Sequence, residues 1–277
     1  MPTDELPPEW VIDPHRPSVA RMYDYYLGGK DNFEADRAAA ERAIAAVPST
    51  LAFTRANRCF LAKAVTMLAE RGVRQFLDIG SGLPTQENVH QVAQRAAPDA
   101  KVAYVDNDPI VLVHARALLA DSERTKVIEA DLREPESILH DETVQSHFDF
   151  DEPIALLMLA VLHFVPEEAD PYGIVEKLKA PLAAGSHVVI SHGHAGEIPE
   201  ALEEQVRGAY GRTEAGDIVP RGPERVMRFF DGCDLLPPGL VPVEDWQPGV
   251  DFFEPDLSRA GFIGGVGALR RRPAAPP

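Results

Sequence analysis

The feature that most constrains this chain is a regular alternation of short apolar runs with longer segments of helical periodicity. Five apolar runs are expected to be strands, at residues 75–79, 102–106, 126–129, 154–159 and 187–191. Helical patterns lie between them at residues 85–96, 109–120 and 171–180. Strands alternating with helices of this length favour a mostly parallel sheet with helices on both faces. We therefore predict a doubly wound α/β fold.

Both ends of the chain add segments to this expected core. Residues 18–47 have a helical pattern interrupted at Gly28 and Gly29, which predicts two helices joined by a glycine hinge. Further expected elements are helices at residues 58–71, 195–210 and 224–231 and a terminal hairpin formed by residues 235–243 and 261–269. We assign residues 1–57 to an N-terminal arm and helical cap, and residues 58–277 to a single α/β domain.

The charge balance restricts the partners. The chain has 27 basic and 44 acidic residues, a formal net charge of −17, which would repel a phosphate backbone, so no nucleic-acid partner is expected. No apolar run reaches the roughly 18 to 20 residues that cross a bilayer, and the acidic, proline-rich N-terminus lacks signal-peptide features. We expect a cytoplasmic protein without a membrane partner, for which a homo-oligomer is possible. The two cysteines have no metal-like spacing, and no metal is expected.

A glycine-rich turn follows the first expected strand, where FLDI leads into GSGLPT. The turn residues Gly80, Ser81 and Gly82 let the backbone approach a ligand closely, and a helix N-terminus follows. Asp78 precedes this turn at the carboxyl end of the strand. A carboxylate there would repel a diphosphate, but it suits the positively charged sulfonium and ammonium groups of S-adenosylmethionine (SAM). Thr85 also stands where the dinucleotide fingerprint has Gly or Ala, so an NAD(P)-dependent oxidoreductase is kept only as an alternative.

Acidic residues also follow the second and third expected strands. Asp106 is placed to accept hydrogen bonds from two ribose hydroxyls, whereas Asp108 is better explained as the cap of the next helix. Asp131 either accepts a hydrogen bond from an adenine amine or caps a helix itself, and the sequence leaves both options open. The neighbouring residues Asn107 and Leu132 complete this part of the candidate cofactor site.

Four stretches of the sequence resemble a known family: RPSVARMYDYYLGGKDNFEAD, FLDIGSGLPTQENVHQVAQ, YVDNDPIVLVHARALL and the EADLREP segment. The chain is similar over roughly residues 14–270 to class I SAM-dependent methyltransferases, and more narrowly to a bacterial subfamily named S-adenosyl methyltransferase. The resemblance implies a seven-stranded Rossmann-like sheet whose last strand is antiparallel. It also implies cofactor contacts from Asp78, Gly80, Gly82, Asp106 and Asp131. Pro84 departs from the third glycine of many class I enzymes, but the subfamily's own LPTQ pattern matches.

The segment RMYDYYLGGKDNF has no counterpart in the minimal class I core. We interpret it as a lid that folds over the cofactor and the acceptor and excludes water. Tyr26 and Gly29, at the glycine hinge, are its predicted ligand contacts. Tyr23 and Tyr25 either contact ligand or pack the cap onto the sheet.

Histidines at strand ends are candidates for a base that would activate a protonated acceptor. His163 follows the fourth expected strand and His192 the fifth, and a histidine pKa near neutrality suits proton transfer. We expect a small-molecule acceptor. Because no acceptor motif is present, a catalytically silent SAM-binding regulator is the second alternative.

Overall fold

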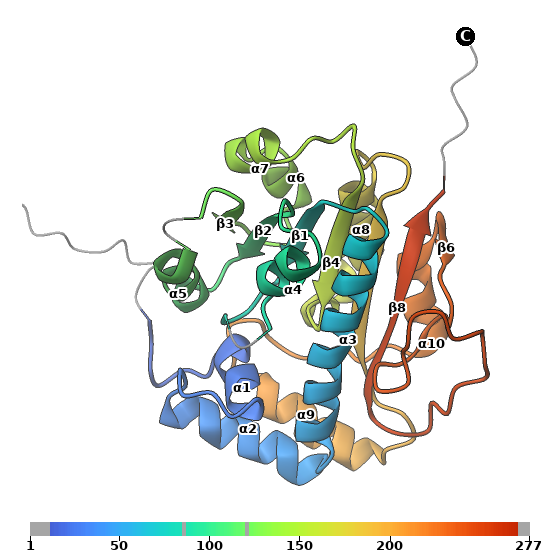
Figure 1. The fold of residues 1–277 in the computed structure, drawn as a ribbon. Helices are drawn as coiled ribbons and strands as arrows, with labels where there is room; N and C mark the ends of the chain where they lie inside the picture. Colours follow the sequence, from blue (N-terminus) through green and yellow to red (C-terminus); the bar gives the residue numbers. More distant parts are fainter. Residues whose placement is uncertain (1–11, 85–86, 120–121, 271–277) are drawn as a thin grey trace, which may run out of the picture.

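An eight-stranded sheet forms the centre of the computed structural model, which describes residues 12–84, 87–119 and 122–270 (Figure 1). Its strands are β1 (Gln75–Ile79), β2 (Lys101–Asp106), β3 (Thr125–Glu129), β4 (Ile154–Leu159), β5 (His187–His194), β6 (Cys233–Leu235), β7 (Val241–Pro242) and β8 (Gly261–Leu269). Their order is β3-β2-β1-β4-β5-β8-β6, and β7 pairs with β8. Strands β1 to β5 are parallel and β8 is antiparallel to β5. The doubly wound α/β prediction, with its antiparallel last strand, is confirmed.

The order of the strands reverses between β1 and β4, which are paired at the centre of the sheet. From β1 the sheet continues through β2 to β3 on one side, and from β4 it continues through β5 on the other. Both strands are buried along their whole length, as the continuous apolar run IALLML of β4 predicts. A crevice opens beyond the carboxyl ends of the strands at such a switch point, and ligands of open α/β sheets bind there.

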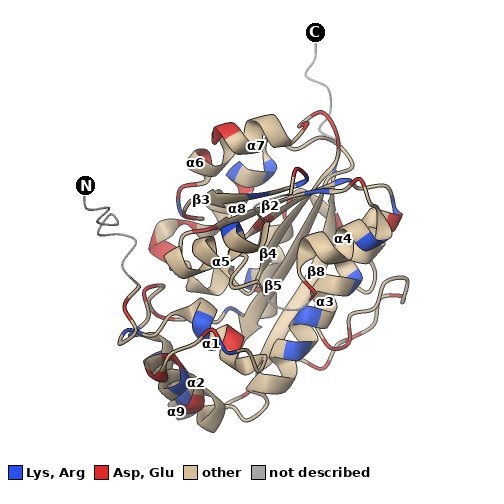
Figure 2. Ribbon diagram, turned by 60° about the vertical axis from the view of Figure 1, so that its left-hand side comes forward, with Lys and Arg blue, Asp and Glu red and all other residues tan. Residues whose placement is uncertain are grey.

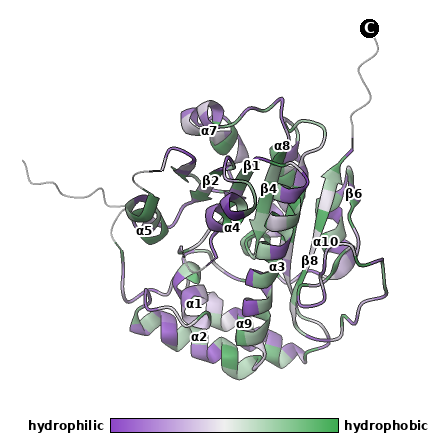
Figure 3. Cartoon of the chain, viewed as in Figure 1, coloured by the Kyte–Doolittle hydropathy of each residue, from purple (hydrophilic) through white to green (hydrophobic). Residues whose placement is uncertain are grey.

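Successive side chains of β1 point to opposite faces and divide the core in two. Phe76 packs with α3 (Thr50–Glu70) and α4 (Val89–Ala96) on one face. Leu77 belongs to the core of the other face, which α6 (Pro135–Leu139), α7 (Glu142–His147) and α8 (Pro171–Lys179) cover. Hydrophobic residues are concentrated in β4 and β8, and charged residues lie mostly outside the central strands (Figures 2 and 3). The helix α5 (Pro109–Leu119) lies beside β3.

A helical cap lies at the carboxyl ends of the strands (Figure 1). It consists of α1 (Val19–Tyr26), α2 (Glu34–Ala46) and α9 (Glu200–Tyr210), and α2 packs against both other helices. Small alanines at positions 39, 40, 43 and 209 allow close approach around Met22 and Tyr26. The cap is therefore built from two segments that are far apart in the sequence.

Several element boundaries differ from the sequence-based expectation. The helix expected at residues 58–71 begins eight residues earlier, at Thr50, so the proposed boundary between residues 57 and 58 lies inside α3. α4 begins at Val89, and the expected start at Thr85 or Gln86 lies outside the described residues. The expected strand at 235–243 is two short strands, β6 and β7, because prolines between them have no amide hydrogen for the ladder. Both pair with β8, as the hairpin prediction required.

The short helix α10 (Pro223–Met227) and the 3-10 helix η4 (Arg228–Phe230) replace the single helix expected at residues 224–231. Two further 3-10 turns, η2 (Leu162–Phe164) and η3 (Glu167–Ala169), follow β4. None of the helices in the described part of the chain is both long and apolar enough to span a membrane.

Candidate functional site

A cleft of about 230 Å³ lies at the carboxyl ends of β1, β2 and β4, beneath the cap. Eight of the residues expected at a cofactor site line it: Asp78, Gly80, Ser81, Gly82, Asp106, Asn107, Asp131 and Leu132. The remaining candidates, Tyr26, Gly29, His163 and His192, do not line it.

The turn after β1 needs glycine at two positions. Gly80 and Gly82 have φ angles of +70° and +66°, in the left-handed region that other residues rarely adopt. A Cβ atom on Gly80 would also collide with the side chain of Val161. The amide of Gly80 donates to the carbonyl of Val105 at 2.8 Å, which ties the turn to β2. At Gly82 no atom of the described residues other than its chain neighbours lies within 4 Å of a Cβ position, so a ligand has room to approach the backbone there.

Asp78 is a carboxylate held in a poorly hydrated place. Its side chain is 5% exposed, and burial raises its pKa to about 7, with Arg58 lowering the pKa and Asp106 adding a smaller increase. A carboxylate whose charge is disfavoured in this way gains most from a bound cation. The sulfonium and ammonium groups proposed from the sequence would supply that positive charge.

Asp106 fixes the glycine turn from the neighbouring strand. Its Oδ2 accepts a hydrogen bond from the amide of Gly82 at 2.8 Å, and its Oδ1 accepts from the amide of Asp108 at 2.9 Å. Burial raises the pKa of Asp106 to about 6, although these backbone donors oppose the increase. Each carboxylate oxygen has more than one acceptor site, so Asp106 can still accept from ribose hydroxyls.

Asp108 caps α5, as the sequence indicated, because its Oδ1 accepts from the amide of Ile110 at 3.0 Å. Its Oδ2 accepts a hydrogen bond from the hydroxyl of Ser18 at 2.5 Å. Ser18 is itself the N-cap of α1. Asp108, two residues after Asp106, thus holds the N-terminus of α1 through Ser18.

Asp131 has a strong partner within the protein. Its carboxylate pairs with the guanidinium of Arg133 at 2.5 Å and accepts from the side-chain amide of Asn107 at 3.1 Å. Burial raises the pKa of Asp131, but the hydrogen bonds and charge of Arg133 outweigh it and the net shift is downward. Asp131 accepts from the amide of Arg133 in a turn, and the next helix begins only at Pro135. Asp131 therefore does not cap that helix.

On α1, Tyr23 and not Tyr26 lines the cleft. The hydroxyl of Tyr23 accepts from the side-chain amide of Asn57 at 3.0 Å. Tyr26 lies one turn further along α1, where its hydroxyl meets that of Tyr210 at 3.0 Å inside the cap. Tyr25 points to Glu41.

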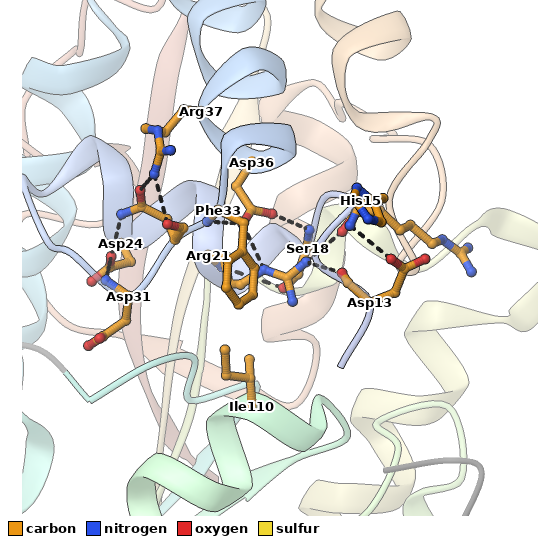
Figure 4. Close-up of polar contacts among 12 residues, drawn as sticks. Asp13, His15, Ser18, Arg21, Asp24, Asp31, Phe33, Asp36, Arg37 and Ile110 are labelled. Atoms are coloured by element: carbon orange, nitrogen blue, oxygen red, sulfur yellow. Dashed lines mark hydrogen bonds and ion pairs between the residues drawn. The ribbon is translucent and has the colours of Figure 1, made fainter. Parts of the chain in front are cut away.

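Gly29 makes room for the side chain of Asp24, because a Cβ atom at this position would overlap the Asp24 carboxylate. The same carboxylate accepts from the amide of Asp31 at 3.0 Å and from the side chain of Asn32 at 2.8 Å. These contacts close the glycine hinge onto α1, and Figure 4 shows Asp24 and Asp31 beside one another. The cleft contacts Asp24 rather than the hinge glycine.

A buried ion pair holds the two N-terminal helices of the cap together (Figure 4). Arg21 and Asp36 are 2.8 Å apart, with side chains 5% and 0% exposed. Asp36 also accepts from the amides of Ser18 at 2.9 Å and Phe33 at 2.7 Å. Arg21 donates to the carbonyl of Arg16 at 2.5 Å. Each buried charge is therefore compensated by several hydrogen bonds.

His163 and His192 lie side by side behind the cleft, with ring centroids 5.4 Å apart. Burial lowers the pKa of His163 to about 3 and that of His192 well below its ordinary value. Nδ1 of His192 donates to the carbonyl of Gly193 at 2.8 Å, and its Nε2 accepts from Arg221 at 3.1 Å. Nδ1 of His163 accepts from the amide of Gly193 at 3.1 Å. Their role as an acceptor base stays a prediction.

The cleft also has residues that the sequence did not indicate: Asp24, Asn57, Arg58, Phe164 and Glu214. Asn57 and Arg58 lie on α3, and Asn57 is a polar residue on the buried face of that helix, which is the signal in the sequence that could have indicated them. Within residues 12–84, 87–119 and 122–270, no group of histidine, cysteine and acidic side chains is arranged to hold a metal ion.

A family model described as S-adenosyl methyltransferase matches residues 7–270 of the chain. Among solved structures, a DUF574 family protein from Streptomyces avermitilis is 38% identical, with a TM-score of 0.85, over 94% of this chain and all of that one. A putative methyltransferase from Thermobifida fusca is also 38% identical with a TM-score of 0.85, over 97% of this chain and all of that one.

A more distant likeness concerns the fold alone. An O-methyltransferase family protein from Burkholderia thailandensis is 12% identical, with a TM-score of 0.50, over 75% of this chain and 55% of that one. No curated protein matches the sequence.

Proposed function

Because the chain belongs to the S-adenosyl methyltransferase family and is a SAM-dependent methyltransferase, we propose that it methylates a small-molecule acceptor in the cleft beneath the cap. The observation that carries this proposal is the convergence of Asp78, Gly82 and Asp106 on one cleft at the switch point of the sheet. The cofactor supplies an electrophilic methyl group on a positively charged sulfur.

The residues of the cleft suit such a cofactor. The buried carboxylate of Asp78 attracts positive charge, and the lone pairs of Asp106 are available to a ribose diol. Asp131, with Asn107 and Leu132 beside it, completes the wall at the end of β3 and is proposed to accept from the adenine amine. The open space at Gly82 lets the backbone contact the ligand.

The cap is proposed to exclude water from the reacting groups. Tyr23 and Asp24 of α1 line the cleft opposite the strand ends, and the Ser18 to Asp108 hydrogen bond holds α1 there. Transfer of a methyl group requires alignment of the two reactants and a dry site. A cleft of about 230 Å³ and a net charge of −17 favour a small acceptor over nucleic acid. We propose that the reaction takes place in the cytoplasm.

A SAM-binding regulator without turnover is the second candidate. It is favoured by one observation, that His163 and His192 are buried behind the cleft with depressed pKa values and do not line it. An oxidoreductase that binds NAD(P) is disfavoured by the buried carboxylate of Asp78, which would face the diphosphate.

Binding and turnover are tested separately. Calorimetric titration with SAM, S-adenosylhomocysteine (SAH) and NADH measures which cofactor binds, and we expect only the first two to bind. Incubation with methyl-labelled SAM and a library of small molecules then measures transfer. Binding of NADH alone would overturn the cofactor assignment, whereas SAM binding without any transferred label would support the regulator.

A further inference from the structure

We propose that the cap side of the cleft is an acceptor pocket for a small molecule carrying a positively charged nitrogen. The acceptor pocket is defined by Tyr23, Asp24, Asn57, Phe164 and Glu214. This inference rests on the proposed function, because it concerns the molecule that receives the methyl group.

The acceptor pocket brings together residues from four parts of the chain. Tyr23 and Asp24 belong to α1 and Asn57 to α3, Phe164 is in the 3-10 turn after β4, and Glu214 follows α9. Contacts within the cap join these parts. Phe164 packs on Tyr210 with ring centroids 5.7 Å apart, and Arg16 donates to the carbonyl of Thr213, beside Glu214, at 3.3 Å.

The acids at the other side of the cleft have assigned partners. Asp78 and Asp106 are proposed to bind the cofactor. Asp108 accepts from Ser18 and from the backbone of α5, and Asp131 pairs with Arg133. Asp24 and Glu214 are the carboxylates that remain. Neither forms an ion pair with a basic side chain in the described part of the chain.

Asn57 gives an independent sign that this pocket receives a ligand with hydrogen-bond donors. It is 3% exposed, and its Nδ2 donates to the hydroxyl of Tyr23. Its buried Oδ1 has no hydrogen-bond partner among the described residues. A buried carbonyl oxygen without a partner is unfavourable, and a donor on the acceptor molecule would satisfy it.

The polar groups that the acceptor pocket presents are mainly negatively charged or hydrogen-bond accepting. Asp24 is 4% exposed and contributes negative charge, although its Oδ2 already accepts from Asp31 and Asn32. Glu214 adds a second carboxylate, and the Asn57 oxygen is an acceptor without a partner among the described residues. The hydroxyl hydrogen of Tyr23 points to the carbonyl of Thr54 at 3.5 Å. The nearby guanidinium of Arg58 donates to the carbonyl of Glu87 at 3.0 Å and acts electrostatically on Asp78.

A cationic nitrogen has the chemistry that these groups recognise. Its N–H bonds can donate to Asn57 and to a carboxylate, and its charge is complementary to Asp24 and Glu214. The ring of Phe164 adds a surface over which a cation is attracted. An anionic acceptor would be repelled by the carboxylates of Asp24 and Glu214, neither of which is paired with a basic side chain in the described part of the chain.

The experiment uses matched triads of small molecules, each consisting of an amine, an alcohol and a carboxylic acid on the same carbon skeleton. Binding to the SAH-saturated protein is measured by saturation-transfer NMR at pH 7. We expect the amines to bind at least tenfold more tightly than their alcohols and acids. Equal binding within the triads, preference for the acids, or binding by no member would overturn the acceptor pocket.

Charge variants connect the preference to these residues. Glu214→Gln and Asp24→Asn should each reduce amine binding about tenfold while SAH affinity changes by less than twofold. The matched control Glu204→Gln removes an exposed acid of α9 outside the cleft and should leave amine binding unchanged. If Asp24→Asn no longer binds SAH, the exposed Glu214 still decides the test. If the wild-type protein itself does not bind SAH, the proposed function fails, whatever the outcome for the amines.

Discussion

At the residue scale, Asp78 has the most unusual environment among the acids at the strand ends of the cleft. Burial of its carboxyl group raises the pKa to about 7, while the charge of Arg58 lowers the pKa and that of Asp106 adds a smaller increase. Binding a cation and losing a proton are therefore linked at this residue.

The affinity for SAM should depend on pH through Asp78. Because the bound cation requires the ionised carboxylate, affinity should be about tenfold weaker at pH 6 than at pH 8, given a pKa near 7 in the free protein. Calorimetric titration across this range measures the effect. Asp78→Asn should bind more weakly at pH 8 and lose most of the pH dependence. A wild-type affinity that is constant from pH 6 to 8 would contradict the link.

The same residue should destabilise the ligand-free fold at high pH. Its pKa is raised on folding from 3.8 to about 7, so the folded state holds the proton more tightly and stability falls as pH rises through that interval. Asp78→Asn removes this cost, and its melting temperature should exceed that of the wild type at pH 8 by more than at pH 5. Thermal unfolding without ligand at both pH values provides the measurement. A larger gain at pH 5 would reverse the sign and refute the assignment.

Asp106→Ala should weaken SAH binding by about 1–3 kcal/mol, the range expected for loss of charge-assisted hydrogen bonds. The substitution also removes the carboxylate that accepts a hydrogen bond from the amide of Gly82. Calorimetry with SAH measures the change. Asp99→Ala, a surface acid paired with Arg74, is the matched control and should bind as the wild type does. Unchanged affinity in Asp106→Ala would remove this residue from the cofactor site.

Sequence reasoning at this scale found the acids and glycines but not the inner face of α1. The acids lie at strand ends, and a parallel sheet brings strand ends together whatever surrounds them. Tyr23 and Tyr26 are one turn apart on an eight-residue helix, and the docking of that helix decides which of them reaches the cleft. That docking depends on Asp108 and on α2, which are distant in the sequence.

At the element scale, local patterns predicted the central strands and long-range contacts decided the rest. The run IALLML can only be a buried strand or a short buried helix segment, and its pairing with β1 and β5 makes it a strand. The helix expected at residues 58–71 lacks the first turns of α3, where Thr54 and Asn57 are polar and yet buried. Both contact Tyr23 of α1, and Asn57 also lines the cleft. The packing of α9 on α2 has no local signal in the sequence.

The ion pair between Arg21 and Asp36 should control the stability of the cap. Asp36→Asn leaves a buried guanidinium without its counter-charge, so we expect a loss of about 3 kcal/mol in the stability of α1 and α2. Hydrogen exchange of the two helices measures it. Glu34→Gln, an exposed acid in the first turn of α2, is the control and should cost less than about 1 kcal/mol. Equal exchange in Asp36→Asn and the control would show that the ion pair contributes little.

At the scale of the whole molecule, the cleft is lined by both the sheet and the cap, so a cofactor bound in it as proposed should stabilise both. SAH at a hundred times its dissociation constant should contribute about 2.7 kcal/mol and raise the melting temperature by about 5–10 °C. Differential scanning calorimetry with and without SAH measures the shift. The Asp106→Ala variant, at the same SAH concentration, should show a smaller one. No shift in the wild type would mean that the folded protein does not bind SAH.

The two-segment cap has a consequence for how the chain is made. The hydroxyls of Tyr26 and Tyr210 meet across 184 residues of sequence. During synthesis from the N-terminus, α1 and α2 emerge first. Their packing partner α9 emerges only after the parallel strands β1 to β5 have left the ribosome. A nascent chain therefore completes the parallel strands before it completes the cap, and a chain that ends between β5 and α9 would have a cap made of α1 and α2 alone.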